Sequence, residues 1–109
     1  MANTFKNAVL TTIGSTITPV YVSAVPAVTV IGATISNRTA SNILVSLLVE
    51  DTSAGQTAYV VKDALVPPGA NIVPIGGEQK VVLELGDRIL AQSSSASSAD
   101  VILSVLEIS

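Results

Sequence analysis

Apolar and polar residues alternate along this chain with a period of two, and turn-forming residues end each apolar run after roughly ten positions. A period of two is typical of β-strands, because successive side chains of a strand point to opposite faces of a sheet. No window of about a dozen residues keeps the helical period of about 3.6 residues. The pattern therefore predicts an all-β protein with no long helix.

The pattern predicts about eight to ten short strands, a number typical of antiparallel β-sandwiches and jelly rolls. We place the strands at residues 5–12, 17–23, 27–36, 43–51, 57–62, 72–75, 80–85, 88–92 and 101–108. Turns are expected at residues 37–42, 67–71 and 76–78, and a Ser-rich solvated loop at 93–98. Pro19 cannot donate to a ladder, which favours a sheet edge for residues 17–23. We predict a single jelly-roll-like β-sandwich domain over residues 1–109.

Two of the predicted strands carry apolar side chains on both faces. In residues 43–51 the face opposite the core holds two leucines, and in residues 101–108 it holds three large aliphatic side chains. A strand with one solvated face normally alternates apolar and polar residues, so these side chains exceed what one small core needs. We predict that they form an interface with a second copy or a larger body. The candidate interface residues are Leu44, Leu48, Ile102, Leu106 and Ile108.

The composition narrows the range of partners. Hydrophobic residues make up 49% of the 109 residues and charged residues only 12%, so a small domain of this kind leaves apolar side chains on its surface. A net charge of −3 and 3% aromatic residues argue against phosphate binding and base stacking, so we expect no nucleic-acid partner. The uncharged stretch between Lys6 and Arg38 is interrupted by Gly and Pro, so we expect no membrane span.

The chain is poor in catalytic groups. It has no His and no Cys, which excludes His-based triads, thiol nucleophiles and His-ligated zinc. Glu50 and Asp51 are adjacent, but they lack the spacing of a calcium-binding EF-hand. All the acids lie at expected strand ends or turns, where a solvated carboxylate is usual: Glu50, Asp51, Asp63, Glu78, Glu84, Asp87, Asp100 and Glu107. We expect no enzymatic activity, no cofactor and no metal site.

Three stretches carry a family resemblance. They are TTIGS leading to PVY within residues 11–21, DTSAG through YVVKD to PPG within residues 51–69, and GGEQKVVL through GD and the Ser-rich loop to VLEI within residues 76–108. Together they span nearly the whole chain. In these turn residues and strand patterns the chain resembles small virion structural proteins of tailed bacteriophages.

The resemblance implies a role in assembly, first of all as a capsid decoration (cement) protein that binds and stabilises the head lattice. It implies a homotrimer whose partners are the major capsid protein or other virion proteins, in a virion assembled in the host cytoplasm. A neck, tail or fibre-attachment component of the same virion is an alternative. A carbohydrate-binding adhesion module is a further alternative, for which only Tyr21 and Tyr59 are candidate aromatic platforms.

Overall fold

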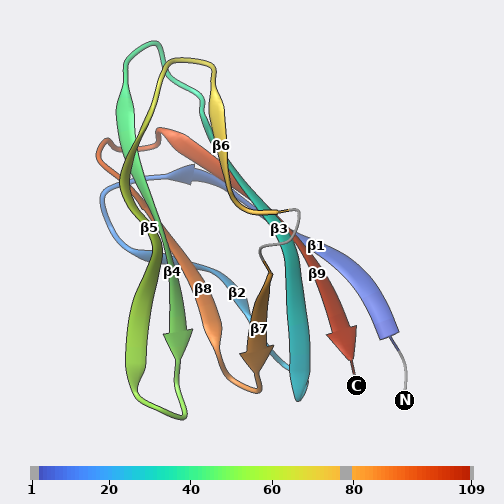
Figure 1. Cartoon of the computed structure of the whole chain (residues 1–109). Coiled ribbons are helices and arrows are strands. Elements are labelled where there is room, and N and C mark those ends of the chain that lie inside the picture. Colours follow the sequence, from blue (N-terminus) through green and yellow to red (C-terminus); the bar gives the residue numbers. More distant parts are fainter. Residues whose placement is uncertain (1–2, 77–79, 109) are drawn as a thin grey trace.

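The computed structural model describes residues 3–76 and 80–108, which form two antiparallel sheets packed face to face (Figure 1). The strands within these ranges are β1 (Asn3–Ile13), β2 (Thr18–Val22), β3 (Ala27–Asn37), β4 (Ile43–Asp51), β5 (Gln56–Val66), β6 (Asn71–Ile75), β7 (Val81–Glu84), β8 (Arg88–Ser93) and β9 (Ala99–Ile108). The predicted all-β sandwich is confirmed, and the described ranges contain no helix. Consequently no helix there could cross a membrane.

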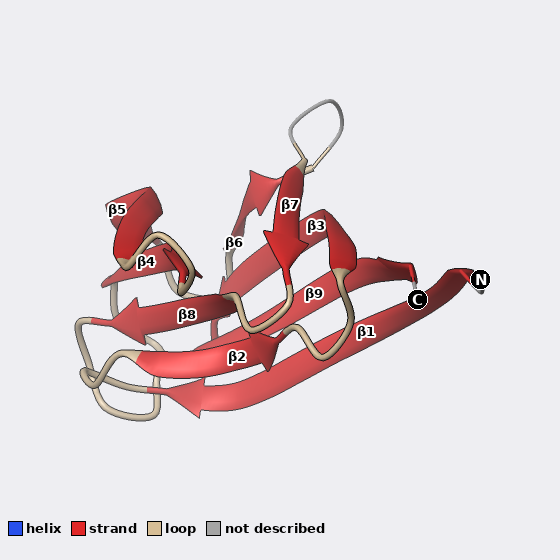
Figure 2. Cartoon of the chain, turned by 90° about the horizontal axis from the view of Figure 1, so that it is seen from below, coloured by secondary structure: helices blue, strands red, loops and turns tan. Residues whose placement is uncertain are grey.

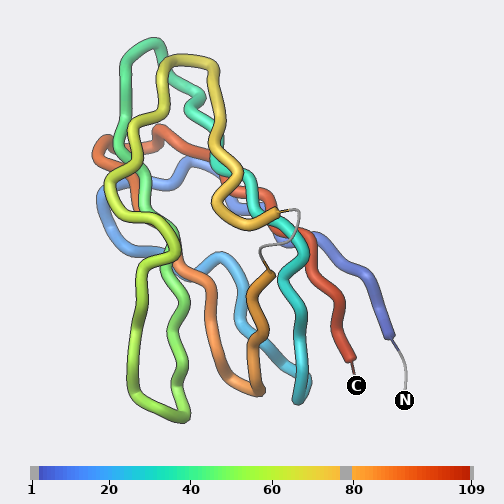
Figure 3. The backbone as a smooth tube through the Cα atoms, in the orientation of Figure 1, coloured from blue at the N-terminus to red at the C-terminus, as the bar shows by residue number. Residues whose placement is uncertain are grey.

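The chain is arranged as one long hairpin that is wrapped into a sandwich. The tip of this hairpin is the turn between β4 and β5, which pair with each other. Moving away from the tip, β3 pairs with β6 and β7, β2 pairs with β8, and β1 pairs with β9. The sheets have the strand orders β1-β9-β3-β6 and β2-β8-β4-β5, and β7 extends the first sheet by pairing with β3. This nesting is the topology of a jelly roll, in which β6 and β7 together take the place of one edge strand. The backbone trace in Figure 3 shows that the β3–β4 and β5–β6 connections extend beyond the other strands at one end of the molecule.

The core lies between the sheets and consists of aliphatic side chains on alternating positions. β9 shows the pattern most simply, because Val101, Leu103 and Val105 are fully buried while Ile102 and Ser104 are exposed. The alternation of residues in the sequence therefore correctly predicts which side chains of β9 are buried and which are exposed.

β3 keeps the alternation only by means of a bulge. Val28 and Val30 point into the core before the bulge, whereas Ala33 and Ile35 do so after it. The register shift between Val30 and Gly32 inserts one residue, which restores the inward face for the second half of the strand. The bulge thus allows one strand of 11 residues to contribute to the core along its whole length.

The structure moves some of the predicted boundaries. β5 continues to Val66 instead of ending at Lys62, past a bulge at which Asp63 adopts a φ of 52°. The turn at 67–71 is confirmed, with the Ala70 N–H donating to the Pro67 carbonyl at 3.1 Å. Residues 77–79, which include most of the turn predicted at 76–78, lie outside the described residues.

The loop at 93–98 is exposed at residues 94–97, as expected of a solvated connector, but its two ends are fixed. Ser93 and Ser98 are buried, and their hydroxyl groups hydrogen-bond to each other. The Ser98 hydroxyl also donates to the Ser95 carbonyl at 2.7 Å, and the Ser98 N–H donates to the Ile13 carbonyl at 3.0 Å. These bonds hold the loop against the end of β1.

Candidate functional site

The outer face of the five-stranded sheet carries rows of uncharged side chains. The pairing of β1, β9, β3 and β7 aligns them in three consecutive rows: Phe5, Leu106, Thr29 and Val82; Asn7, Ser104 and Gly32; and Val9, Ile102 and Thr34. No side chain in these rows is charged. Phe5 is 75% exposed and Val9 is 56% exposed, so the apolar groups of the outer rows are accessible to a partner.

Asn7 and Ser104 of the middle row line a shallow hollow. Ser104 and Gly32 are small, and they lie between rows that hold larger side chains. The hollow has a volume of about 360 Å³ and is lined by Phe5, Lys6, Asn7, Ile31, Ser104 and Val105. Its lining contains no carboxylate and no nucleophile other than a serine hydroxyl and the Lys6 amine. It therefore suits contact with a surface better than it suits catalysis.

The five predicted interface residues do not form one patch. Ile102, Leu106 and Ile108 lie on the outer face of the five-stranded sheet, because their neighbours Val101, Leu103 and Val105 point inward. Leu44 lies on the outer face of the other sheet and is 40% exposed. The doubly apolar strands thus provide two separate surfaces on opposite sides of the sandwich.

Leu48 requires a correction, because it is only 3% exposed. It is paired in register with Leu90 of β8 and with Tyr59 of β5. Side chains that are directly opposed across neighbouring strands share a face and lie about 5 Å apart, so these neighbours cover the leucine. Leu48 is a buried residue within the domain and not an exposed contact residue.

The outer face of the four-stranded sheet, unlike the three rows described above, carries charged side chains. Glu50 of β4 accepts a hydrogen bond from the Arg88 guanidinium of β8, and this bond is the main reason that the pKa of Glu50 is lowered. The Lys62 ammonium lies 5.3 Å from the centre of the Tyr59 ring. Charged side chains are well solvated, and an apolar partner would have to displace that water. This face is therefore a poorer candidate for apolar docking than the outer face of the five-stranded sheet.

Tyr21 links the two sheets at one end of the sandwich. Its hydroxyl donates to Oε2 of Glu107 at 2.5 Å, and Oε1 of Glu107 lies 3.1 Å from Lys6 Nζ. The hydrogen bond from Tyr21 lowers the pKa of Glu107, with Lys6 contributing further. Burial, and then the Glu107 carboxylate, raise the pKa of the Tyr21 phenol. Tyr21 is therefore engaged within the domain, which weakens its candidacy as a sugar platform.

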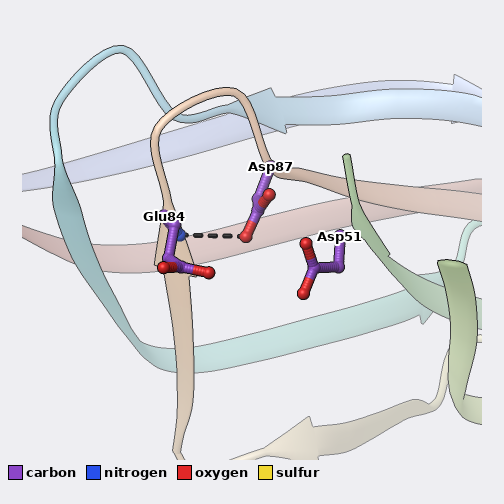
Figure 4. A group of neighbouring side chains, drawn as sticks. All are labelled: Asp51, Glu84 and Asp87. Carbon is purple, nitrogen blue, oxygen red and sulfur yellow. Dashed lines mark hydrogen bonds between the residues drawn. The ribbon is translucent and has the colours of Figure 1, made fainter. Parts of the chain in front are cut away.

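The carboxylate of Asp51, at the end of β4, lies beside those of Glu84 and Asp87, which flank the turn after β7 (Figure 4). Oxygen atoms of Asp51, Glu84 and Asp87 lie within 4.8 Å of one another. Oδ2 of Asp87 accepts a hydrogen bond from the Glu84 N–H at 2.9 Å, and its Oδ1 accepts one from the Thr52 N–H at 3.1 Å. Asp87 is buried, contrary to the expectation that every acid is solvated.

Oxygen donors of this kind are the ligands that calcium and magnesium prefer. Both oxygens of Asp87 are already used by backbone N–H groups, however, and Asp51 accepts bonds from Ser53 and Ala54 that lower its pKa. The arrangement therefore works as a clamp that joins the β4–β5 turn to the β7–β8 turn. The sequence signal for it is weak, because an Asp after a Gly is common in tight turns.

No protein-family model and no curated protein matches the sequence. Solved structures do match the fold. One is a chain from the acidic stable capsid of Helicobacter pylori bacteriophage KHP30, with 10% identity, a TM-score of 0.60 and coverage of 99% of this chain and 89% of that chain. A second is a subunit of the disulfide-linked pili that form Bacillus endospore appendages, with 11% identity, a TM-score of 0.60 and coverage of 96% and 87%.

A third match is a chain of the infectious bursal disease virus particle, with 10% identity and a TM-score of 0.50. It covers 96% of this chain but 35% of that chain. At such low identities the likeness shows a shared fold. These three chains come from a phage capsid, a pilus and a virus particle.

Proposed function

We propose that this chain is a virion structural protein, and more specifically a capsid decoration protein that binds the head lattice through the outer face of its five-stranded sheet. The observation that carries the proposal is the uncharged, apolar set of rows from Phe5 to Val82 and from Val9 to Thr34. The fold it shares with a phage capsid chain of similar extent supports the same reading. The absence of His and Cys favours a role without catalysis.

A capsid surface repeats the same site many times, so contacts that are weak for one copy become strong when copies act together. We include in the proposal a homotrimer placed at a local symmetry axis, with the major capsid protein as its partner. Because the chain has no Cys, its assembly cannot use disulfide bonds, unlike that of the disulfide-linked pili that share the fold.

A neck, tail or fibre-attachment component is the second candidate, since the same apolar face would serve it equally well. The number of copies per virion separates the two. Quantitative mass spectrometry of purified particles should find copies in the hundreds for a head decoration protein and roughly a dozen or fewer for a neck or tail component. Absence of the chain from particles would refute both.

A matched pair of variants tests the docking face. Ile102→Asp places a carboxylate in the uncharged row between Val9 and Thr34, whereas Leu44→Asp places one on the outer face of the other sheet. Both residues are substantially exposed, so both variants should fold. We expect Ile102→Asp to lose binding to particles that lack the protein and Leu44→Asp to keep it. The reverse result would assign docking to the four-stranded sheet.

A further inference from the structure

Sheet edges expose unpaired backbone N–H and C=O groups, and natural sandwiches protect them with prolines, bulges, charges or short strands. Among the described strands, three of the four sheet edges carry such protection. β2 contains Pro19 and a register shift. β6 contains Pro74, and β7 beside it is only four residues long. β5 has two register shifts against β4 and the adjacent charges Lys62 and Asp63.

The edge formed by β1 lacks this protection over most of its length, since its register shift against β9 lies near its end, between Leu10 and Ile13. From Asn3 to Leu10, β1 pairs with β9 through eight consecutive residue pairs without a bulge, and the strand contains neither Pro nor Gly. Its one charged residue, Lys6, is paired with Glu107. β1 runs along the margin of the molecule in Figure 2, and no strand within residues 3–76 and 80–108 is hydrogen-bonded on its outer side. A long, regular and open edge of this kind is a template for another strand.

We propose that β1 pairs with β1 of a second copy, antiparallel and about a two-fold axis at Asn7. A strand of identical sequence is available in every copy, and a two-fold contact uses the same surface on both partners. The inference concerns contact between copies and does not depend on binding to a capsid. If the copies also form trimers through another surface, the β1 contact would link one trimer to the next.

The sequence of β1 selects the register. Residues that oppose each other across an antiparallel pair share a face, so a two-fold axis must pass beside one residue of each copy. With the axis at Asn7, exposed Phe5 faces exposed Val9 of the other copy, an aromatic and β-branched pair of the kind that stabilises sheets. In the same register Lys6 faces Ala8, so the two lysines avoid each other.

The neighbouring registers are worse. An axis at Lys6 places the two Lys6 ammonium groups opposite each other, which is destabilising. An axis at Ala8 leaves Phe5 opposite Thr11 and Val9 opposite Asn7, and both apolar pairs are lost. With the axis at Asn7, moreover, the row that ends in Phe5 of one copy continues into the row that begins with Val9 of the other. The uncharged rows of the two outer faces then continue from one copy into the other.

Because the chain has no Cys, single cysteines can trap this contact without background. We would compare Asn7→Cys with the matched controls Lys6→Cys and Ala8→Cys in the full chain, under mild oxidation and on non-reducing gels. In the proposed register the two residues 7 are directly opposed at about 5 Å between Cα atoms, within disulfide reach. The two residues 6, and likewise the two residues 8, are offset by two positions and lie about 8 Å apart, beyond it.

We expect the Asn7→Cys dimer to form at least about tenfold faster than either control dimer, since only its Cα separation permits the bond. Equal rates for the three variants would overturn the proposal. Faster dimerisation of Lys6→Cys or Ala8→Cys would overturn the Asn7 register. Circular dichroism of each variant checks that the sandwich is intact.

A second substitution in the Asn7→Cys background tests the apolar pair. Val9→Lys places an ammonium group opposite Phe5, whereas Val82→Lys changes a similarly exposed valine on the same face but on β7, away from the β1 edge. We expect Val9→Lys to slow trapping about tenfold, because the Phe5–Val9 pair occurs twice in the two-fold contact. Val82→Lys should leave the rate unchanged. An equal effect of both lysines would show that β1 is not the contact.

Discussion

At the scale of single residues, a few buried polar side chains hold the turns in place. Asn37 is buried at the end of β3, and its amide donates to the carbonyls of Ser41 at 2.7 Å and Val66 at 3.0 Å. Its carbonyl oxygen accepts from the Thr39 N–H at 2.8 Å. One asparagine thereby joins the β3–β4 turn to the end of β5. Asp87 does the same for the two turns at the opposite end of the sandwich.

The contrast between Leu48 and Leu44 gives a test at this scale. Leu48→Asp would bury a carboxylate in an apolar site, so we expect the free energy of unfolding to fall by about 3 kcal/mol. Leu44→Asp affects a side chain on the same outer face that is 40% exposed, so its cost should stay below about 1 kcal/mol. Urea denaturation of both variants measures the difference. Similar values for the two would contradict the burial of Leu48.

At the scale of elements, bulges and cross-sheet bonds determine how the strands fit together. The bulge in β3 keeps both halves of the strand in contact with the core. The Tyr21 hydroxyl connects β2 of one sheet to Glu107 on β9 of the other. The sequence predicted both strands, but it did not predict this bond, because the two residues are 86 positions apart.

The Tyr21–Glu107 bond should make stability depend on pH. The pKa of Glu107 lies below its ordinary value of 4.5 in the folded chain. A lowered pKa contributes stability above the unfolded pKa, and this contribution is lost as the pH falls through the folded value. In Tyr21→Phe the main cause of the shift is absent. We therefore expect the stability difference between wild type and Tyr21→Phe to be larger at pH 7 than at about pH 3.

Urea denaturation at the two pH values measures this difference. Tyr59→Phe is the matched control, because Tyr59 lies exposed on an outer face, and its effect should be the same at both pH values. A Tyr21→Phe effect that does not change with pH would show that the hydroxyl does not favour the ionised carboxylate.

At the scale of the whole molecule, the two sides of the sandwich are chemically unequal. One outer face has three uncharged rows between rows that hold Glu84 and Asp100, while the other has the Glu50–Arg88 pair on its two central strands, together with Lys62. A decoration protein that docks through the uncharged rows would be held by apolar burial, which salt does not screen.

We therefore expect the proposed attachment to virions to survive about 1 M sodium chloride, where the Debye length is only about 3 Å. Sulfate should strengthen it, because excluded salts favour apolar burial. Sedimentation of particles with bound protein at increasing salt measures both effects. Release by sodium chloride would point instead to ion pairs, and hence to the charged face.

The sequence by itself determined the strand positions, most of the turns and the lack of His and Cys chemistry. The alternation of apolar and polar residues and the positions of proline and glycine are local signals, so they do not depend on which strands pair with one another. Tertiary structure alone decided which apolar second faces stay exposed. Leu44 and Leu48 have the same periodicity, but register with Leu90 and Tyr59 buries only Leu48. It also brought Asp51 to the turn that holds Glu84 and Asp87, because this proximity depends on pairings between strands that are distant in the chain.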